Sequence, residues 1–283
     1  MCRWLVYKGE PIFISDLVFQ RGHSLIDQSM NPRESVETTN GDGFGIGWYA
    51  ERTIPGVYRD VYPAWNDRNL RNIAEQVRSG LFMAHIRAAT GTPVQRTNSH
   101  PFHYGRWLFQ HNGLIPEFTR CKHAVYSLID PKYAGFISGS TDSELLFYLT
   151  LTMGLERDVR GAFVRTIDAI EEIRSDMKIE EPLFLTAACI DGERVYGVRY
   201  VSPGGEARTL YHTTASDDVR SMLDDRAGHR GFGIIIASEP LDDDSDRWQA
   251  VPEGSLLTVG AAGLIEVEPL VEPAGGARSQ AAG

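Results

Sequence analysis

Apolar residues recur along the chain with two different patterns, and together these patterns predict a protein of mixed strands and helices. Short runs rich in β-branched and aromatic residues predict strands, because such side chains fit a pleated and half-buried surface. These runs are residues 2–8, 43–50, 56–62, 81–90, 107–113, 183–190, 194–200, 208–214, 231–238 and 254–260. Residues 10–19 fit either a further strand or a turn that leads into a helix.

Three other segments place apolar residues at intervals of three and four, which predicts amphipathic helices. In the first, Gly80 is expected to end the helix. In the second, a Ser/Thr/Asp cap precedes one apolar face that includes Leu145, Leu149 and Met153. The segments are residues 65–80, 140–154 and 157–176.

The order of these elements predicts the fold class. Strands come first, followed by one helix, more strands, two adjacent helices and a final set of strands. This order indicates an α+β sandwich whose helices group on the outer faces, and it does not fit alternating βαβ units. No internal repeat or linker divides the chain, so we expect one domain over residues 2–271. The Gly/Ala/Pro-rich tail, residues 272–283, is expected to be disordered.

Composition and charge narrow the classes of function. The 28 Lys+Arg against 38 Asp+Glu give a net charge of -10, which disfavours nucleic acid and anionic membranes as partners. Three scattered cysteines are too few for a disulfide framework and fit a reducing compartment. The first residues lack a signal-peptide pattern, and no later run is apolar enough to span a membrane. We therefore expect a cytoplasmic protein.

The second residue is the first candidate for chemistry. Aminopeptidases remove a methionine that precedes a small residue such as Cys2, which leaves a thiol and a free α-amino group on one residue. An α-amine with a pKa of about 7.7–8.0 can carry protons at neutral pH, so this residue combines a nucleophile with a base. The alternative is a structural or incidental cysteine.

Three further sites have both a chemical and a structural interpretation. Arg87 ends an apolar strand, where its planar guanidinium either binds a substrate carboxylate or forms an internal salt bridge. Asn112 and Gly113 either point two neutral donors at one spot, as in an oxyanion hole, or form a plain turn. Asp142 begins a predicted helix and either binds a ligand or caps that helix.

Sequence patterns for cofactors and metals are weak. The run NGDGFGIGW is rich in glycine, but Trp48 stands where a nucleotide-binding loop requires glycine, and no Walker lysine follows. The loop over residues 91–106 contains His100 and His103, but their spacing does not define a metal site. We therefore expect no cofactor and no metal, and we assign no chemistry to this loop.

The motifs gain meaning from their order along the chain. MCR at the start, NGDGFGIGWY, HIRAAT, NSHPF, HNG and STDSE together resemble a class II glutamine amidotransferase domain, a member of the N-terminal-nucleophile hydrolases. The resemblance covers residues 2–260 and is closest to the stand-alone branch, in which the glutaminase domain is nearly the whole chain. It implies a four-layer αββα sandwich of two mainly antiparallel sheets, in agreement with the order of elements.

The resemblance also implies roles for the candidate catalytic residues. Cys2, exposed by loss of Met1, would attack the side-chain amide of glutamine or of a γ-glutamyl compound and form a γ-glutamyl thioester. Its own α-amino group would move the protons. Asn112 and Gly113 would hold the oxyanion that forms during the attack.

Other residues would bind the amino-acid end of the substrate. The resemblance implies that Arg87 binds the α-carboxylate, that Asp142 binds the α-ammonium group, and that Thr90 lines the same pocket. Residues 87–91 depart from the pattern of many family members, which carry an aromatic residue after the arginine and a histidine shortly beyond the threonine. The fine shape of the pocket is therefore expected to differ.

Three functions remain open from the sequence. The chain is a self-sufficient hydrolase of γ-glutamyl compounds, a glutaminase subunit that delivers ammonia to a separate synthase partner, or a binding or regulatory protein that retains the fold without turnover. A hydrolase needs the Cys2 thiol and a free N-terminus, whereas a binding protein needs neither.

Overall fold

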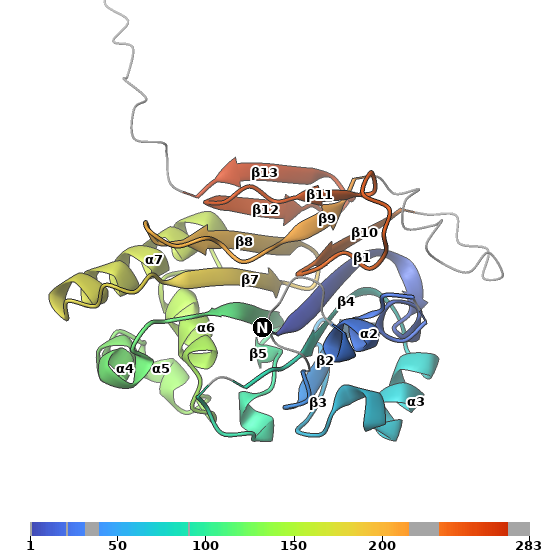
Figure 1. The fold of residues 1–283 in the computed structure, drawn as a ribbon, viewed down its shortest axis with the longest axis horizontal. Helices are drawn as coiled ribbons and strands as arrows, with labels where there is room; N and C mark the ends of the chain where they lie inside the picture. Colours follow the sequence, from blue (N-terminus) through green and yellow to red (C-terminus); the bar gives the residue numbers. More distant parts are fainter. Residues whose placement is uncertain (1, 21, 32–39, 90, 215–231, 271–283) are drawn as a thin grey trace, which may run out of the picture.

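Two antiparallel sheets lie face to face between two groups of helices (Figure 1). The computed structural model describes residues 2–20, 22–31, 40–89, 91–214 and 232–270. The seven-stranded sheet has the order β11 (Trp248–Ala250), β9 (Tyr211–Thr213), β10 (Gly233–Ala237), β1 (Arg3–Phe13), β4 (Arg78–Ile86), β2 (Phe44–Tyr49) and β3 (Gly56–Asp60). The six-stranded sheet has the order β13 (Ile265–Pro269), β12 (Ser255–Val259), β8 (Val195–Val201), β7 (Phe184–Ile190), β6 (Trp107–Leu114) and β5 (Phe102–Tyr104).

A buried apolar layer joins the two sheets. Trp4, Val6 and Met83 enter it from the seven-stranded sheet, and Leu108 and Leu257 enter it from the six-stranded sheet. The packing of the two sheets brings the residue before β1 close to the end of β6, where Asn112 Nδ2 lies 2.8 Å from the carbonyl oxygen of Cys2.

Glycines in β2 allow unusually close packing next to this layer. A Cβ atom at Gly45 would lie 2.0 Å from the carbonyl oxygen of His100, and one at Gly47 would lie 2.8 Å from Leu108 Cδ1. Contacts this short cannot be relieved where the opposing atom is backbone, so only glycine fits at position 45. The glycine-rich run thus serves strand packing, and the hairpin predicted for residues 43–62 is confirmed.

Helices cover both outer faces. Side chains from α1 (Ser15–Val18), α2 (Leu25–Met30) and α3 (Arg68–Gln76) form one apolar cluster with the seven-stranded sheet. Side chains from α4 (Phe118–Ser127), α5 (Pro131–Ala134), α6 (Asp142–Thr152) and α7 (Val159–Asp176) form another with the six-stranded sheet. The predicted four-layer αββα sandwich is confirmed, with the two helical layers on opposite sides in Figure 1. None of the described helices is long and apolar enough to cross a membrane.

Two predicted helix and turn boundaries are wrong. Gly80 does not end a helix, because α3 stops at Gln76 and β4 begins at Arg78. Gly80 lies inside β4, where a Cβ would meet the carbonyl oxygen of Gly9 at 2.5 Å beside an irregularity in β1. The Asn-Gly pair at residues 112–113 forms no turn either, since both residues continue β6 and pair with β7.

The helix predicted for residues 140–154 is present as α6, but it is not amphipathic. Residues 143–151 are all buried. The reason is that α6 packs on β6 while α4 and α7 cover its other sides. Residues 10–19 combine both expectations, because β1 runs to Phe13 and α1 follows. The tail over residues 272–283 lies outside the described residues.

Candidate active site

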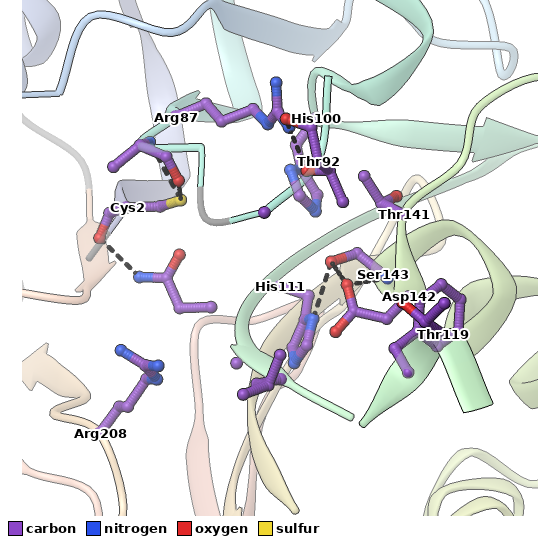
Figure 2. Close-up of a pocket in the computed structure, with 16 residues that line it drawn as sticks. Cys2, Arg87, Thr92, His100, His111, Thr119, Thr141, Asp142, Ser143 and Arg208 are labelled. Carbon is purple, nitrogen blue, oxygen red and sulfur yellow. Dashed lines mark hydrogen bonds between the residues drawn. The ribbon is translucent and has the colours of Figure 1, made fainter. Parts of the chain in front are cut away.

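The chemically interesting residues of the sequence meet at one cavity. Cys2 directly precedes β1, Arg87 directly follows β4, Asn112 and Gly113 lie near the end of β6, and Asp142 begins α6. All five line a hollow of about 260 Å³, close to the lower end of the usual range for ligand pockets, which is about 300–1,000 Å³ (Figure 2). Strand ends and one helix start therefore create the site between the two sheets.

Cys2 is held by contacts to both its side chain and its backbone. Its Sγ lies 3.3 Å from the amide nitrogen of Ala88, which donates to it, and 3.5 Å from the carbonyl oxygen of Ala88. Burial raises the pKa of the Cys2 thiol, although the Ala88 amide and nearby positive charges act in the opposite direction. The resting side chain is therefore a thiol at neutral pH, and attack by its sulfur requires a base.

The carbonyl oxygen of Cys2 is fixed from two sides. Asn112 Nδ2 donates to it at 2.8 Å, and Arg3 Nη1 donates to it at 3.2 Å. An amide nitrogen carries two hydrogens, so Asn112 retains a second donor besides the one that Cys2 uses. Cys2, the residue directly before β1, is in this way tied to β6 across the gap between the sheets.

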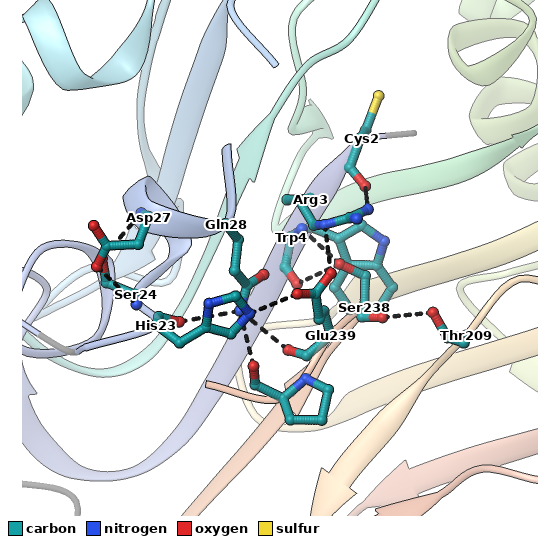
Figure 3. A network of polar contacts seen from close by, with 11 residues as sticks. Cys2, Arg3, Trp4, His23, Ser24, Asp27, Gln28, Thr209, Ser238 and Glu239 are labelled. Atoms are coloured by element: carbon teal, nitrogen blue, oxygen red, sulfur yellow. Dashed lines mark hydrogen bonds and ion pairs between the residues drawn. The ribbon is translucent and has the colours of Figure 1, made fainter. Parts of the chain in front are cut away.

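Behind Cys2 lies a buried network of charged and polar groups (Figure 3). Arg3 Nε lies 2.9 Å from Glu239 Oε2, and Glu239 Oε1 lies 2.5 Å from His23 Nε2. Gln28 Nε2 donates to the carbonyl oxygen of Glu239 at 3.3 Å. The network connects the segment after β10 and the start of α2 to the residue that follows Cys2.

Gly113 occupies a position that has no room for a side chain. A Cβ there would lie 2.0 Å from the carbonyl oxygen of Phe184 and 2.0 Å from His111 Nε2. The glycine is therefore a requirement of the close packing between β6 and β7 at the cavity wall. It also leaves the backbone of this residue accessible from the cavity.

Asp142 presents a carboxylate that the backbone holds in place. Its Oδ2 accepts from the amide of Ile115 at 2.9 Å, and its Oδ1 accepts from the amide of Ser143 at 2.8 Å. The capping residue of α6 is Thr141, whose side chain accepts from the amide of Glu144. Thr141 and not Asp142 is thus the N-cap, but Asp142 also accepts from an amide of the first turn, so it both supports the helix start and lines the cavity at the positive end of a helix.

Arg87 has no internal salt bridge among the described residues. Its Nη1 donates to the carbonyl oxygens of Asp42 at 3.4 Å and Pro93 at 3.2 Å, and its Nη2 donates to Thr92 Oγ1 at 2.6 Å. These neutral acceptors orient the guanidinium without neutralising its charge. The salt-bridge interpretation of Arg87 is wrong for the described part of the chain, whereas Thr90, predicted to line the same pocket, lies outside it.

Two buried histidines, His100 and His111, line the cavity, and a third, His85, packs on His100. The rings of His85 and His100 stack with their centroids 4.1 Å apart, and His111 Nδ1 lies 2.9 Å from Ser143 Oγ. Burial lowers the pKa of His85 to about 3 and also lowers the pKa values of His100 and His111. His103, in contrast, is exposed on β5 and does not line the cavity. The histidines at the cavity are therefore neutral at pH 7.

One cation at the cavity was not predicted from the sequence. Arg208 lines the hollow together with Cys2, from the segment between β8 and β9. The sequence places this residue at the start of a predicted strand, where nothing distinguishes it from the other arginines. Its place at the cavity depends on the path of the segment between β8 and β9, which the sequence does not show.

Comparison with known proteins decides the family. The family model of class II glutamine amidotransferases matches residues 21–278. The probable glutamine amidotransferase DUG3 of Saccharomyces cerevisiae is 36% identical over 291 aligned residues, which cover 92% of this chain and 82% of that protein. The chain belongs to the class II glutamine amidotransferase family.

Other relatives of this class II glutamine amidotransferase have different names. A γ-glutamyl-hercynylcysteine sulfoxide hydrolase of Mycolicibacterium smegmatis is 29% identical over 272 residues, which cover 95% of this chain and 100% of that protein. A solved glutamine aminotransferase class-II domain protein from Silicibacter pomeroyi is 32% identical with a TM-score of 0.71, and the match covers 95% of this chain and 99% of that one.

A more distant structure supports the fold alone. The glutamine phosphoribosylpyrophosphate amidotransferase of B. subtilis is 15% identical with a TM-score of 0.60, and the match covers 96% of this chain and 50% of that one. The predicted N-terminal-nucleophile hydrolase fold of this class II glutamine amidotransferase is confirmed.

Proposed function

We propose that this protein is an amidohydrolase that cleaves the γ-amide bond of glutamine or of a γ-glutamyl compound, with Cys2 as nucleophile. The observation that carries the proposal is the meeting of Cys2, Arg87, Asn112, Gly113 and Asp142 at one cavity, although they come from separate parts of the chain. A thiol, two neutral donors, a cation and an anion are the groups that this reaction needs.

The reaction begins once Met1 has been removed. The Cys2 sulfur attacks the γ-carbonyl carbon, and the thiol proton passes to the α-amino group of the same residue as the S–C bond forms. The amine then gives this proton to the departing nitrogen while the C–N bond breaks, so ammonia or an amine leaves. Water hydrolyses the γ-glutamyl thioester, which releases the glutamyl acid and restores the thiol.

Asn112 and Gly113 stabilise the negative oxygen of the tetrahedral intermediate. The Asn112 side chain donates one of its two hydrogens to the Cys2 carbonyl, and the second remains for the substrate. Because the Asn112 bond to Cys2 orients both donor and nucleophile, the hole and the sulfur keep a fixed relative position. Loss of one such donor typically lowers kcat by about 10²–10³-fold.

Arg87 and Asp142 bind the amino-acid end of the substrate. The Arg87 guanidinium, whose described acceptors are all neutral, binds the α-carboxylate through its uncompensated positive charge. The Asp142 carboxylate, which lines the same cavity, binds the α-ammonium group. A zwitterion thus meets a cation and an anion, which sets the γ-amide over the thiol.

The comparisons favour a hydrolase that works by itself over a subunit that depends on a synthase partner. A relative named as a hydrolase aligns over its full length with 95% of this chain, which supports hydrolysis by a chain of this extent. We assign the reaction to a single domain over residues 2–271. Delivery of ammonia to a separate synthase remains the second candidate, favoured by the relative named as an amidotransferase.

The proposal is tested by product release from glutamine and a panel of γ-glutamyl amides and peptides. The wild-type chain is expected to release glutamate from at least one of them, and Cys2→Ala is expected to release none. Intact mass of the purified protein gives an independent check, because uniform retention of Met1 would exclude the free α-amine. Equal rates in the wild type and Cys2→Ala would overturn the mechanism, and full activity without any added protein would overturn the need for a partner.

A further inference from the structure

Arg208 provides a second positive charge at the cavity, apart from the one attributed to the amino-acid end of the substrate. In the view of Figure 2, Arg87 lies above Cys2 and Arg208 lies below it, so the two guanidinium groups are on opposite sides of the nucleophile. Both residues line the cavity. A substrate that spans the sulfur can therefore meet a cation at each end.

The backbone that carries Arg208 is rigidly held. Arg199 of β8 donates from Nε to the carbonyl oxygen of Arg208 at 2.9 Å, and from Nη2 to that of Ala207 at 3.2 Å. Its Nη1 donates to the carbonyl oxygen of Val251 at 2.7 Å. The Arg208 guanidinium itself lies over the Phe184 ring, with Cζ 5.5 Å from the ring centroid. These contacts place the cation before any ligand arrives.

The guanidinium of Arg208 nevertheless lacks an anionic partner. Among the described residues it forms no ion pair, and its buried Nε has no hydrogen-bond acceptor. Arg3, in contrast, pairs with Glu239, and Arg87, which also forms no ion pair among the described residues, donates to neutral oxygens. Burial lowers the pKa of Arg208, which means that its surroundings penalise the charge. The Asp142 charge favours the Arg208 cation, but no described carboxylate forms an ion pair with it, so this half-buried cation at a cavity is a ready site for an anion.

We propose that Arg208 binds a carboxylate on the amine portion of the substrate, the portion that leaves when the γ-amide bond breaks. This inference rests on the proposed function. If Arg87 and Asp142 bind the glutamyl end and Cys2 meets the γ-carbonyl carbon, the group attached to the scissile nitrogen extends toward the remaining side of the sulfur, where Arg208 lies. The preferred substrates are then γ-glutamyl amino acids or peptides, and glutamine, which has no second anionic group, is a poorer substrate.

A pair of substrates that differ only in this carboxylate tests the proposal. We compare kcat/KM for γ-glutamylglycine and for γ-glutamylglycinamide, in which a neutral amide replaces the carboxylate. The wild type is expected to prefer the carboxylate. In Arg208→Met the ratio of the two kcat/KM values is expected to fall about 10- to 100-fold, the usual effect of one hydrogen bond to a charged group. Arg208→Lys is expected to restore part of the ratio.

A matched control separates this effect from the general loss of a positive charge. Arg52 is exposed on the hairpin between β2 and β3, so Arg52→Met removes the same charge far from the cavity. Its ratio is expected to equal that of the wild type. Equal losses on both substrates in Arg208→Met, with an unchanged ratio, would overturn the proposal and would mean that Arg208 acts on the reacting atoms instead.

Binding measurements distinguish a failure of this inference from a failure of the proposed function. If the wild type hydrolyses neither compound, the hydrolase proposal fails, but calorimetry on Cys2→Ala still compares the affinities for the two compounds. Tighter binding of γ-glutamylglycine, lost in Cys2→Ala/Arg208→Met, would support the carboxylate site without turnover. Equal affinities of Cys2→Ala for both compounds would overturn it.

Discussion

Arg3 and Glu239 form an ion pair at 2.9 Å although their residues are only 0% and 1% exposed. The same arginine donates to the carbonyl oxygen of Cys2, so the pair lies directly behind the nucleophile. His23 contacts the other oxygen of the Glu239 carboxylate. The geometry indicates that this buried charge pair serves to hold the start of β1 in one position.

Removal of the negative partner from this pair is expected to destabilise the protein strongly. Glu239→Gln retains the shape but leaves Arg3 uncompensated, and loss of one member of a buried pair costs about 3–5 kcal/mol. Urea unfolding gives the free energy of unfolding. The control is Glu75→Gln, which removes the partner of Arg71 from an exposed helical pair and is expected to cost about 0.5 kcal/mol or less. Similar losses in the two variants would contradict the assigned importance of burial.

Asn112→Ala is expected to lower kcat by about 10²–10³-fold with a much smaller change in KM, because an oxyanion donor acts mainly in the transition state. Steady-state kinetics on the best substrate measure this. Gln110→Ala is a matched control, since Gln110 lies two residues earlier on β6 and donates from its side-chain amide to the carbonyl of Leu5 in β1, much as Asn112 donates to that of Cys2 just before β1. Comparable losses of kcat in both variants would show that strand contacts, and not the oxyanion, explain the effect.

Asp142→Asn is expected to weaken recognition of the α-ammonium group. Asparagine retains the size of the side chain but not its charge, so kcat/KM for glutamine is expected to fall about 10- to 100-fold. The comparison substrate is 4-carbamoylbutanoate, which has the carboxylate and the amide of glutamine but no ammonium group. A fall of the same size on this compound would argue against a contact between Asp142 and the ammonium group.

Activity is expected to rise between about pH 7 and pH 8, because the α-amine of Cys2 must be neutral to accept the thiol proton and its ordinary pKa is about 7.7–8.0. Burial raises the pKa of the thiol, so the thiol itself does not titrate in this window. The pH profile of kcat/KM measures the rise. Constant activity from pH 5 to pH 9 would exclude the amine as the base.

Stability is expected to fall in acid because buried histidines must be protonated on unfolding. Burial lowers the pKa of His85 to about 3, so its contribution is complete above the unfolded pKa of about 6.5 and is lost as the pH falls toward 3. Between pH 7.5 and pH 5, His85 accounts for about 2 kcal/mol of the decrease. His85→Leu should remove this part in urea unfolding at both pH values, and His123→Leu on the exposed face of α4 should not.

Much of the fold could be predicted because strand and helix periodicities are local properties of the sequence. The long helix α7 and the strands β2, β7 and β8 match their predicted segments closely, whereas β1 extends five residues beyond the predicted end. Predicted element boundaries were wrong where contact with a segment distant in sequence determines the backbone conformation. Gly80 marks the close approach of β1 and not the end of a helix, and Gly113 marks the close approach of Phe184 and not a turn. A single sequence cannot distinguish such glycines from turn glycines.

The residues of the site also divide into those that a local motif predicts and one that only the folded chain shows. Cys2, Arg87, Asn112 and Asp142 each belong to a short motif whose order indicated the family, and the structure gathers them at one cavity. Arg208 has no such motif, and its relevance depends on the path of the chain after β8. The family match covers residues 21–278 and therefore does not include Cys2. The placement of Cys2 at the cavity is an observation of the structure alone.

The placement of β1 has a consequence for how the protein loses activity. This strand pairs with β10 on one edge and with β4 on the other, so its amide groups are protected on both sides. Hydrogen exchange at such an interior strand follows openings that approach complete unfolding, unlike exchange at loops or chain ends. Cys2 directly precedes this strand, which we expect to be among the slowest to exchange, so heat or denaturant should abolish activity only together with the fold.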